Sequence, residues 1–460
     1  MATQQARSHA VVVGASIGGL LAARVLSDRF ERVTVLERDS LVDQPLPRKA
    51  VPQGEHLHIL LYGGLQLLEA LFPGLRHELV ADGAQQCGTE DGSRYQAGTY
   101  LPRFRSEYEQ LSMTRPFLEL HLRQRVESLP NVSILDGHTV TRLLTPSGED
   151  RTRVTGVEVL RSGRNPESRQ LGADLVVDAG GRGSHAPVWL SELGYGRPDE
   201  EKISIGVGYT TCAFRRSPEQ APPRFFSCIL PTPREETRAG AMLPVEGDRW
   251  LVTLSGWLGD HAPPDREGFL AFAKSLPAPE IYDVITGAEA ISDFTTYAYP
   301  TNLRRRYDRM RRHPEAFIVL GDALCSFNPI YGQGMSVTAR EAVALGETLD
   351  RHRNELPRHF YRRAARVIDG PWRVTAGGDF GFPGVTGAKP PASGLVNRYV
   401  AAAQQRASDD PVVCRTLVEV TIMMRPPAAL FSPQLACRVL GGTALARLQR
   451  LAPLHARAGS

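Results

Sequence analysis

Two glycine-containing turns, far apart in the chain, hold the residues best suited to binding a reactive cofactor. The first follows an apolar run from Val11 in VVVGASIGGLLAARVL, which reads as a strand, a tight turn and a helix. A helix that begins directly after such a turn points free backbone N–H groups at an anion, typically a pyrophosphate. The second lies in FIVLGDALCSFNPIYGQGMS, where a strand ends at Asp322 and the chain passes Pro329 to a turn at Gly332 and Gly334. That order suits a ribose followed by an isoalloxazine ring, so the two segments together predict a flavin dinucleotide.

The first turn departs at one position from the dinucleotide pattern G-x-G-x-x-G. Gly14, Ser16 and Gly19 occupy its three glycine positions, and Gly18 precedes the last of them. Ser16 is small enough for the backbone to approach a pyrophosphate, and its hydroxyl can donate to a phosphate oxygen. Glu37 ends the second apolar strand, where an acidic side chain accepts hydrogen bonds from the adenosine ribose. The turn and Glu37 therefore predict FAD rather than FMN.

The same residues match two other patterns. Gly14 to Gly18 reads as G-x-S-x-G, the nucleophile elbow of α/β-hydrolases, but only thirteen residues precede the turn. That leaves no room for the upstream strand and oxyanion loop, so a hydrolase is not expected. An ordinary βαβ unit with a glycine-rich turn is the plainer alternative.

Residues 9 to about 384 resemble the single-component flavin monooxygenases of the para-hydroxybenzoate hydroxylase fold, which include squalene epoxidase. The segments PRKAVPQGEHLHILLYGGLQLLEALFPG, DLVVDAGGRGS, GDALCSFNPIYGQGMS and PWRVTAGGDFGFPG look most like flavin epoxidases that act on polyene precursors of polyether natural products. DAGGRGS departs from the D-G pattern of the aromatic hydroxylases, which weakens the case for an aromatic substrate.

The resemblance implies roles for individual residues. Glu37 would hold the adenosine ribose, Arg115 would reach the FAD phosphates and Asp322 would bind the ribityl and pyrophosphate region. Arg48 would lie close to the flavin, and Asp178 matches the family's second dinucleotide-facing segment. The residues expected at the cofactor are Gly14, Ser16, Gly18, Gly19, Glu37, Arg38, Arg48, Arg115, Asp178, Asp322, Pro329, Gly332, Gly334 and Met335.

The implied chemistry is reduction of the flavin, reaction with dioxygen and oxygen transfer from a flavin C4a-hydroperoxide. NADPH or NADH would reduce the flavin as a transient donor, or a partner flavin reductase would do so. The backbone amides of Gly332 and Gly334 would face the N1 and O2 edge of the ring and favour its reduced anion, with Arg48 the third residue assigned to catalysis. We expect the chain at Gly334 to pass so close to the ring that a side chain would collide with it.

The substrate is expected on an antiparallel sheet between residues 185 and 300. FFSCIL, GAMLPVEGDRWLVTLSGWL and ISIGVGYTTCAF are short apolar or alternating runs separated by turn residues. Phe225, Phe226, Trp250 and Trp257 are candidate wall residues. No constellation of bases is evident, which favours epoxidation of alkenes in a large hydrophobic polyketide or terpenoid intermediate, as in antibiotic biosynthesis.

Several alternatives remain open. They are an aromatic hydroxylase of the same fold, a reductase of prenyl double bonds, a non-redox cyclase that keeps FAD as a scaffold, and a non-enzymatic binding protein. None of the four tryptophans lies in the W-x-W-x-I-P segment of flavin halogenases, so halogenation is not expected.

Composition supports an enzyme that binds a small hydrophobic molecule and dioxygen. A chain of 460 residues with 42% hydrophobic content can bury a large core. The net charge of +4 is small and basic residues are interspersed with acids, so no nucleic-acid surface is indicated. The six cysteines lack C-x-x-C spacing, which fits the cytoplasm, and no acidic or cysteine cluster accompanies His56 and His58, so no metal site is predicted. No transmembrane segment or targeting signal is evident.

The predicted fold class is α/β. A Rossmann-like FAD-binding domain of the para-hydroxybenzoate hydroxylase and glutathione reductase type would carry an inserted antiparallel-sheet substrate domain and C-terminal helices. The expected divisions are residues 1–184 and 301–350 for the FAD-binding domain, 185–300 for the substrate domain, and 351–460 for a helical region. Residues 376–394, rich in glycine and proline, are expected to form a long loop over the entrance to the site.

Overall fold

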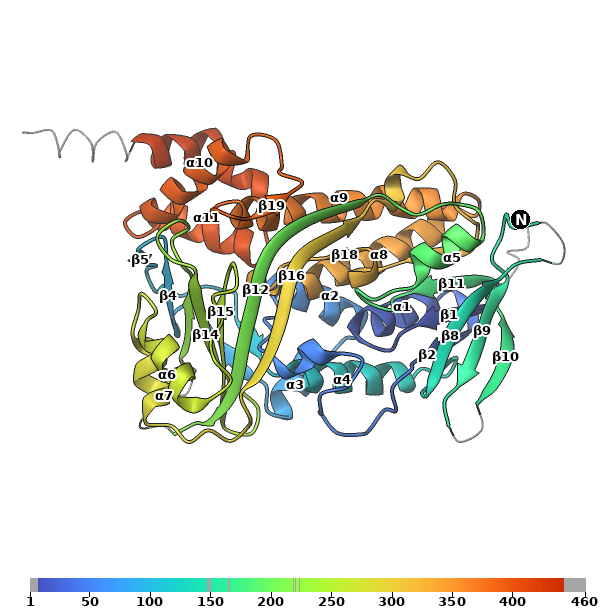
Figure 1. Cartoon of the computed structure of the whole chain (residues 1–460), viewed down its shortest axis with the longest axis horizontal. Coiled ribbons are helices and arrows are strands. Elements are labelled where there is room, and N and C mark those ends of the chain that lie inside the picture. Colours follow the sequence, from blue (N-terminus) through green and yellow to red (C-terminus); the bar gives the residue numbers. More distant parts are fainter. Residues whose placement is uncertain are drawn as a thin grey trace, which may run out of the picture.

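The computed structural model of the chain describes residues 7–146, 150–163, 166–217, 219, 221–222 and 224–441. The outer ends of the first and last expected divisions, residues 1–6 and 442–460, lie outside the described residues. The described part of the chain forms an α/β fold with one parallel sheet and a large, mainly antiparallel one (Figure 1).

A five-stranded parallel sheet in the order β17-β11-β1-β2-β7 forms the first layer. Its central strand β1 (Arg7–Val13) lies between β2 (Phe30–Leu36) and β11 (Leu175–Asp178), with β7 (Val132–Leu135) and β17 (Phe317–Val319) at the edges. The carboxyl-terminal parts of the inner strands are mainly apolar and buried, as is typical of a parallel sheet covered on both faces. In sequence, edge strand β17 follows strands β12 to β16 of the second sheet. The chain therefore leaves this layer and returns to it.

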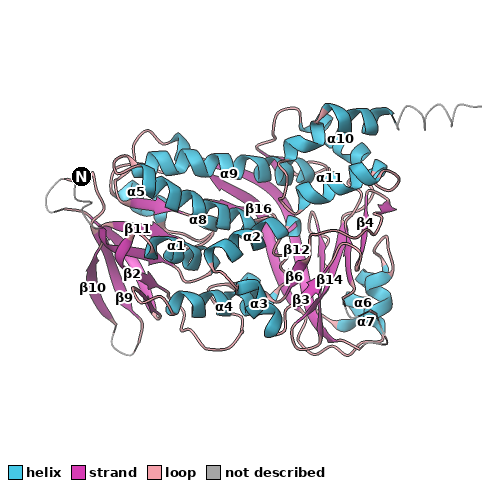
Figure 2. Ribbon diagram, turned by 180° about the vertical axis from the view of Figure 1, so that it is seen from behind, coloured by secondary structure: helices cyan, strands magenta, loops and turns pink. Residues whose placement is uncertain are grey.

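Helices pack around this sheet and against one another (Figures 1 and 2). α1 (Ile17–Ser27) and α8 (Gly334–Arg351) pack together, and α9 (Leu356–Asp379) packs on α8. The others in the first half are α2 (Tyr62–Leu71), α3 (Leu75–Ala81), α4 (Arg115–Glu127) and α5 (Ala186–Glu192). The first half of the chain also contains two small sheets. One has three strands, β8 (His138–Leu144), β9 (Gly156–Arg161) and β10 (Glu167–Gly172), and the other pairs β3 (Gln85–Cys87) with β6 (Gln110–Ser112).

The second sheet runs in the order β18-β16-β12-β15-β14-β13-β4-β5, with β19 paired to β12. Its strands are β4 (Gly92–Gln96), β5 (Thr99–Tyr100), β12 (Glu200–Arg215), β13 (Phe226–Ile229), β14 (Arg238–Val245), β15 (Arg249–Gly256), β16 (Thr295–Arg305), β18 (Cys325–Ser326) and β19 (Thr386–Gly387). The sheet therefore takes β4 and β5 from residues expected in the FAD-binding domain, and β16 crosses the expected boundary at residue 300. The turn residues Glu246 to Asp248 correctly predict the hairpin of β14 and β15. Pairing between strands that are distant in the chain leaves no signal in the local sequence.

The two faces of this sheet contact different partners. On the rear face, Trp250 and Phe214 pack with Phe269 against α6 (Arg266–Lys274) and α7 (Glu280–Thr286). On the inner face, Phe226 and Leu243 pack with residues of the segment that precedes α2. Alternate residues of a strand point to opposite faces, so each residue can serve only one of these surfaces.

The four residues expected to line the substrate wall are divided by this alternation. Trp250 and Phe225 belong to the rear core, so their assignment to the wall is wrong. Trp257 lies beyond the end of β15 and stacks on Phe382, with ring centroids 4.3 Å apart. Only Phe226 is part of the inner cluster. Sequence hydrophobicity does not distinguish the two faces when both are buried.

The C-terminal part also departs from expectation. Helix α9 continues to Asp379 through Pro371, although this stretch is rich in glycine. The small residue at Gly378 is required by packing, since a Cβ there would lie 2.2 Å from the Tyr331 hydroxyl. The chain then forms β19, α10 (Ser393–Arg406), α11 (Pro411–Thr421) and a short turn of helix at Pro427–Phe431. No helix among the described residues is long and apolar enough to cross a membrane.

We predict that Trp250→Ala lowers the free energy of unfolding by about 3–5 kcal/mol through the cavity it leaves behind the sheet. FAD content and flavin absorbance should not change, because the side chain faces away from the first layer. Since the buried Trp250 Nε1 has no hydrogen-bond partner, Trp250→Phe is a matched control and should cost much less. Urea denaturation gives the energies, and a spectral change in the flavin of Trp250→Ala would contradict the placement.

Candidate active site

The glycine turn between β1 and α1 has the close packing that its sequence predicts. Gly14 adopts φ +96°, and a Cβ there would lie 2.8 Å from the carbonyl oxygen of Ala179. A Cβ on Gly19 would lie 1.7 Å from the carbonyl oxygen of Gly14. Only glycine satisfies both contacts. α1 begins at Ile17, so the first N–H groups of the helix are presented at the turn without partners inside the helix.

Glu37 lies at the end of β2 and is held in place by backbone groups. Its carboxylate accepts hydrogen bonds from the Ala15 N–H at 2.8 Å and the Asp39 N–H at 3.0 Å. The side chain is buried beside the turn, at the position expected for the adenosine ribose. A carboxylate has further acceptor sites beyond these two, so it can still accept from a ribose hydroxyl.

Arg48 lies against this acidic group rather than on the flavin loop. Its Nη1 is 3.1 Å from Glu37 Oε2, and its Nη2 is 2.5 Å from Glu119 Oε1. Burial opposes the charge, yet the carboxylates of Glu119 and Glu37 hold the pKa of Arg48 above its usual value. Arg48 thus marks the pyrophosphate end of the expected site. Glu119 was not predicted from the sequence. It lies on α4, and only the folding of α4 against the turn brings it to Arg48.

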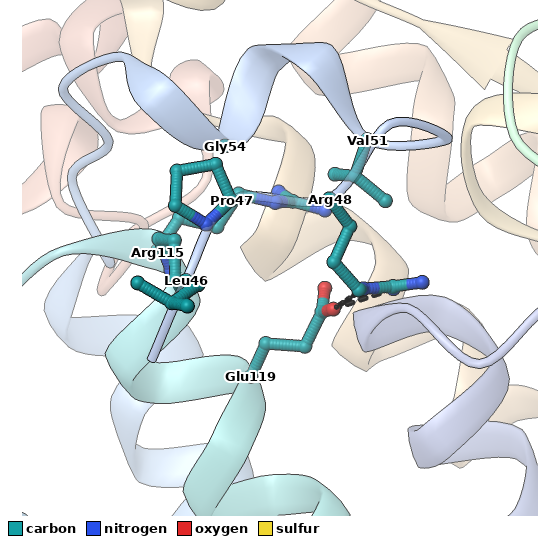
Figure 3. Close-up of a pocket in the computed structure, with 8 residues that line it drawn as sticks. Leu46, Pro47, Arg48, Val51, Gly54, Arg115 and Glu119 are labelled. Carbon is teal, nitrogen blue, oxygen red and sulfur yellow. Dashed lines mark hydrogen bonds and ion pairs between the residues drawn. The ribbon is translucent and has the colours of Figure 1, made fainter. Parts of the chain in front are cut away.

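Arg115 provides an open cationic group at the same place. Its Nη2 donates to Ser16 Oγ at 3.0 Å, while its buried Nε has no partner. Ser16 Oγ in turn donates to Glu119 Oε2 at 2.6 Å. Arg48, Arg115 and Glu119 line a small pocket between the residue 46–54 segment and α4 (Figure 3). An unsatisfied buried guanidinium beside a free helix N-terminus fits a phosphate.

The second segment lies at the junction of the two sheets. Asp322 follows β17, and no described residue donates a hydrogen bond to its carboxylate. Burial raises the pKa of Asp322, and the guanidinium groups of Arg115 and Arg182 oppose this rise. The preceding Gly321 donates its N–H to Glu341 Oε2 at 2.7 Å, which fixes the start of this turn. Asp322 is therefore partly buried, and its carboxylate is free to accept from a ligand.

Gly332 and Gly334 differ in conformation. Gly332 adopts φ +65°, a left-handed conformation that favours glycine. Gly334 is the first residue of α8, has no positive φ, and a Cβ there would meet nothing within 4 Å. A side chain would therefore strain the backbone at Gly332 and not at Gly334. The open space beside Gly334 is where the edge of the flavin ring is expected, so a methyl group would compete with the ring and not with protein.

The remaining residues assigned to the cofactor are placed as follows. Asp178 is buried and accepts from its own loop, from Gly180 N–H at 2.8 Å and from the Ser184 hydroxyl. It therefore braces the loop that packs on Gly14. Arg38 is exposed, and Met335 is buried in the main core. Two more lie next to other parts of the site: Gly18 in the first turn of α1 and Pro329 at the start of a short helical turn, Pro329–Tyr331.

A buried carboxylate that the sequence did not single out joins the site to the rest of the fold. Asp379 Oδ1 accepts from Trp257 Nε1 at 3.0 Å, Asn328 Nδ2 at 2.8 Å and the Tyr331 hydroxyl at 3.4 Å. Its Oδ2 accepts from Asn302 Nδ2 at 2.6 Å. Burial raises the pKa of Asp379 to about 6, and the donated hydrogen bonds limit the rise.

His56 forms a polar group on the inner face of the large sheet. Its Nδ1 is 2.8 Å from Thr211 Oγ1, which is 2.6 Å from Thr253 Oγ1. Its Nε2 is buried without a partner. Burial lowers the pKa of His56 to about 4, so the ring is neutral near pH 7. Tyr209 packs edge-on to this ring at 4.7 Å between centroids. This group leaves no local signal in the sequence, because the partners of His56 come from distant strands.

We predict opposite effects for the two glycines of the flavin loop. Gly332→Ala should lower the free energy of unfolding by roughly 1–2 kcal/mol because of its left-handed conformation. Gly334→Ala should leave stability unchanged or raise it, since alanine favours a helix, but it should weaken FAD binding. Chemical denaturation and FAD titration of the same two proteins separate the effects. Unchanged FAD affinity in Gly334→Ala would show that the loop does not face the ring.

We predict a distinct pH dependence for Glu341→Gln. Burial raises the pKa of Glu341 from 4.5 to about 8, so the folded protein holds a proton that the unfolded chain releases between these values. Stability of the native protein should therefore fall as pH rises from about 4.5 to about 8. Glutamine keeps the acceptor for Gly321 and cannot titrate, so the variant should gain stability relative to the native protein over this window. Parallel denaturation curves at all pH values would refute the assignment.

Comparisons with known proteins agree with this geometry. The model of the FAD binding domain family matches residues 7–355. Protein Rv3254 of Mycobacterium tuberculosis is 36% identical over 427 residues, covering 88% of each chain, and kynurenine 3-monooxygenase of Chaetomium globosum is 25% identical over 259 residues, covering 53% of this chain and 52% of that one.

Two solved structures show the same fold. The flavin-dependent brominase Bmp2 superposes with a TM-score of 0.66 at 14% identity, over 96% of this chain and 100% of that one. The p-nitrophenol 4-monooxygenase PnpA of Pseudomonas putida superposes with a TM-score of 0.64 at 18% identity, over 92% and 99%. The chain therefore belongs to the FAD binding domain family, with the fold of the flavin monooxygenases.

Proposed function

We propose that this flavin monooxygenase family member epoxidises one or more alkenes of a large hydrophobic polyketide or terpenoid intermediate. FAD, when bound and reduced, would supply the activation of dioxygen, and NADPH, NADH or a partner flavin reductase would supply the electrons. The observation that carries the proposal is the position of the inner face of the large sheet. It lies opposite Asp322 and the flavin loop, so a substrate on it would meet the cofactor.

Two hydrogen bonds and one charge effect support this juxtaposition. Tyr299 on β16 bonds Ser326 on β18 at 2.6 Å and receives a hydrogen bond from Arg182 at 3.0 Å. These bonds hold β16 beside β18, which follows the turn that contains Asp322. Burial is the main cause of the raised pKa of Tyr209 and of Tyr297, and the carboxylate of Asp322 adds to the rise of both. The reacting part of a substrate would lie between them.

The lining beyond these tyrosines is apolar. Phe226, Leu243 and Cys87 form a buried cluster against which Leu57, Ile59 and Cys228 pack. Such a surface would hold a hydrocarbon chain and keep water from the reacting atoms. Epoxidation of an electron-rich alkene requires position and a dry site and no proton transfer from the substrate. The apolar lining favours this reaction, and the resemblance to squalene-epoxidase-like enzymes belongs to the same proposal.

Hydroxylation of a phenol or enol is the second candidate, and His56 is the observation that favours it. Its neutral ring carries an unpaired Nε2, and its Nδ1 is linked through Thr211 to Thr253. This is the arrangement of a base that accepts a proton from a substrate hydroxyl. The kynurenine and p-nitrophenol monooxygenases act, by their names, on other substrates, and they do not decide between the two reactions.

We predict that the purified protein binds FAD and not FMN, and that Asp322→Ala lowers FAD occupancy. Loss of a charged acceptor in a buried site costs about 1.5–3 kcal/mol, or roughly tenfold to a hundredfold in affinity. Arg103→Ala is the control, because Arg103 is exposed beside Phe225 and is not among the residues assigned to FAD, so its removal should not change the titration. The family assignment would fail for this chain if added FAD were not bound at all.

We predict that product carries one oxygen atom from labelled dioxygen, with consumption of reduced nicotinamide. Product formation at full rate without oxygen would favour the cyclase, and a saturated product without label would favour the prenyl reductase. His56→Phe distinguishes the two oxygenations, since it should leave epoxidation almost unchanged and slow hydroxylation by about a hundredfold, the usual effect of losing a general base. A pH-rate profile that loses its acidic limb only in the variant would identify His56 as that base.

A further inference from the structure

A row of paired residues crosses the inner face of the large sheet from the His56 group to a distant arginine. Residues directly opposite one another in neighbouring strands point to the same face. The register across five strands joins, in order, Thr211, Thr253, Ala241, Cys228 and Arg94. Because His56 bonds Thr211, this is the face that lies toward the flavin loop. Four strand spacings of about 4.8 Å separate the ends, so Arg94 lies on the order of 19 Å from Thr211.

Arg94 has no ion pair with any described residue. Its one hydrogen bond to a described residue, from Nη2 to the Thr89 carbonyl, is 3.5 Å long. Its guanidinium lies 5.4 Å from the centroid of the Phe226 ring. Burial lowers the pKa of Arg94, opposed only by the thiols of Cys228 and Cys414 among the described groups. A guanidinium taken out of water without an anionic partner is costly to the fold.

Other poorly exposed arginines of the chain have the carboxylate partner that Arg94 lacks. Arg304 lies 2.7 Å from Asp369, and Arg305 lies 3.2 Å from Glu200. Arg48 has carboxylates on two sides. Arg94 is the exception among these, and it lies at the end of the apolar cluster that contains Phe226 and Cys228. Its free donors are placed to meet an anion that arrives with an apolar ligand.

We propose that Arg94 binds the terminal carboxylate of an elongated apolar substrate whose other end reaches His56 and the flavin loop. The inference rests on the proposed monooxygenase function only for the position of the reacting end. A carboxylate is the anion that fits, because one planar guanidinium matches it with two parallel hydrogen bonds. No second cation lies among the described groups that contact Arg94, and a multiply charged phosphate would require one.

The site also selects for length. The apolar residues Phe226, Leu243 and Leu57 lie in the cluster that separates Arg94 from the His56 group. A short acid cannot neutralise Arg94 and reach His56 at once, whereas a long-chain acid can do both. Arg94 is thus a residue that determines specificity, and it acts on binding rather than on oxygen transfer.

Equilibrium binding to the full-length protein with oxidised FAD tests the proposal without turnover. The probes are palmitate, methyl palmitate and hexadecyl phosphate, followed by the change in flavin absorbance. The native protein should bind palmitate at least about tenfold more tightly than its ester, the effect of one charge-assisted hydrogen bond. Arg94→Gln should remove this preference by weakening palmitate and leaving the ester unchanged. Arg94→Lys should retain part of it.

Arg103→Gln is the matched control. Arg103 also lies over an aromatic ring, 6.0 Å from the centroid of Phe225, but it is exposed, so its removal should leave all three affinities unchanged. FAD content and the denaturation midpoint verify that each variant is folded. If Arg94→Gln fails to fold, the acid-to-ester ratio of the native protein and the intermediate ratio of Arg94→Lys decide the question.

Three results would overturn the proposal. The first is that the native protein does not prefer palmitate to its ester, either because it binds both equally or because it does not bind palmitate. The second is that Arg94→Gln keeps the full preference for the acid. The third is that the native protein binds hexadecyl phosphate more tightly than palmitate. Failure of the proposed function is a separate result, because it appears as the absence of oxygen incorporation while the acid preference and its loss in Arg94→Gln persist.

Discussion

The buried carboxylate of Asp379 is the constraint that holds the large sheet, the flavin loop and the end of α9 together. Four donors surround it, and they come from the end of β15, from β16 and from the segment that leads to the flavin loop. A buried charge without such donors would be several kcal/mol less favourable, so the donors and the carboxylate must assemble together. The three segments are therefore held in one arrangement by a single side chain at the end of α9.

The consequence for the site is direct. Asn328 donates to Asp379 and caps the helical turn Pro329–Tyr331, and that turn ends in the left-handed Gly332. Any displacement of Asp379 would move the chain that is expected to contact the ring edge. The glycine at position 378 belongs to the same unit, since it admits the Tyr331 hydroxyl beside the helix. The glycine-rich end of α9 is conformationally unfavourable by itself, and the packing and hydrogen bonds of this unit compensate for it.

Much of the dinucleotide half could be predicted from sequence because its signals are local. The strand, glycine turn and helix at Gly14 to Gly19 lie within one short segment, and the acidic residue at the end of β2 follows at a characteristic distance. Asp178, Arg38 and Met335 were expected at the cofactor through the family resemblance, and the structure places them in a braced loop, on the surface and in the main core. Their contacts with FAD stay a prediction.

The substrate half could not be predicted at this level for a different physical reason. Its side chains are brought together by register between strands far apart in sequence, as with His56, Thr211 and Thr253. A sheet buried on both faces gives no alternation of polar and apolar residues, so Trp250 and Phe226 look equivalent although they lie on opposite faces. Only the pairing pattern distinguishes them.

The distribution of arginine partners connects the two halves. Several poorly exposed guanidinium groups of this chain are neutralised by carboxylates, as in Arg304 with Asp369, whereas Arg340 donates to the carbonyl of Met423. Arg115 near the pyrophosphate position keeps one buried Nε without a partner, and Arg94 at the far end of the inner face has no carboxylate at all among the described residues. Burying an unsatisfied cation destabilises a protein unless a ligand completes it. The two incomplete arginines therefore indicate where anionic groups of bound molecules belong, one at the cofactor and one at the remote end of the substrate.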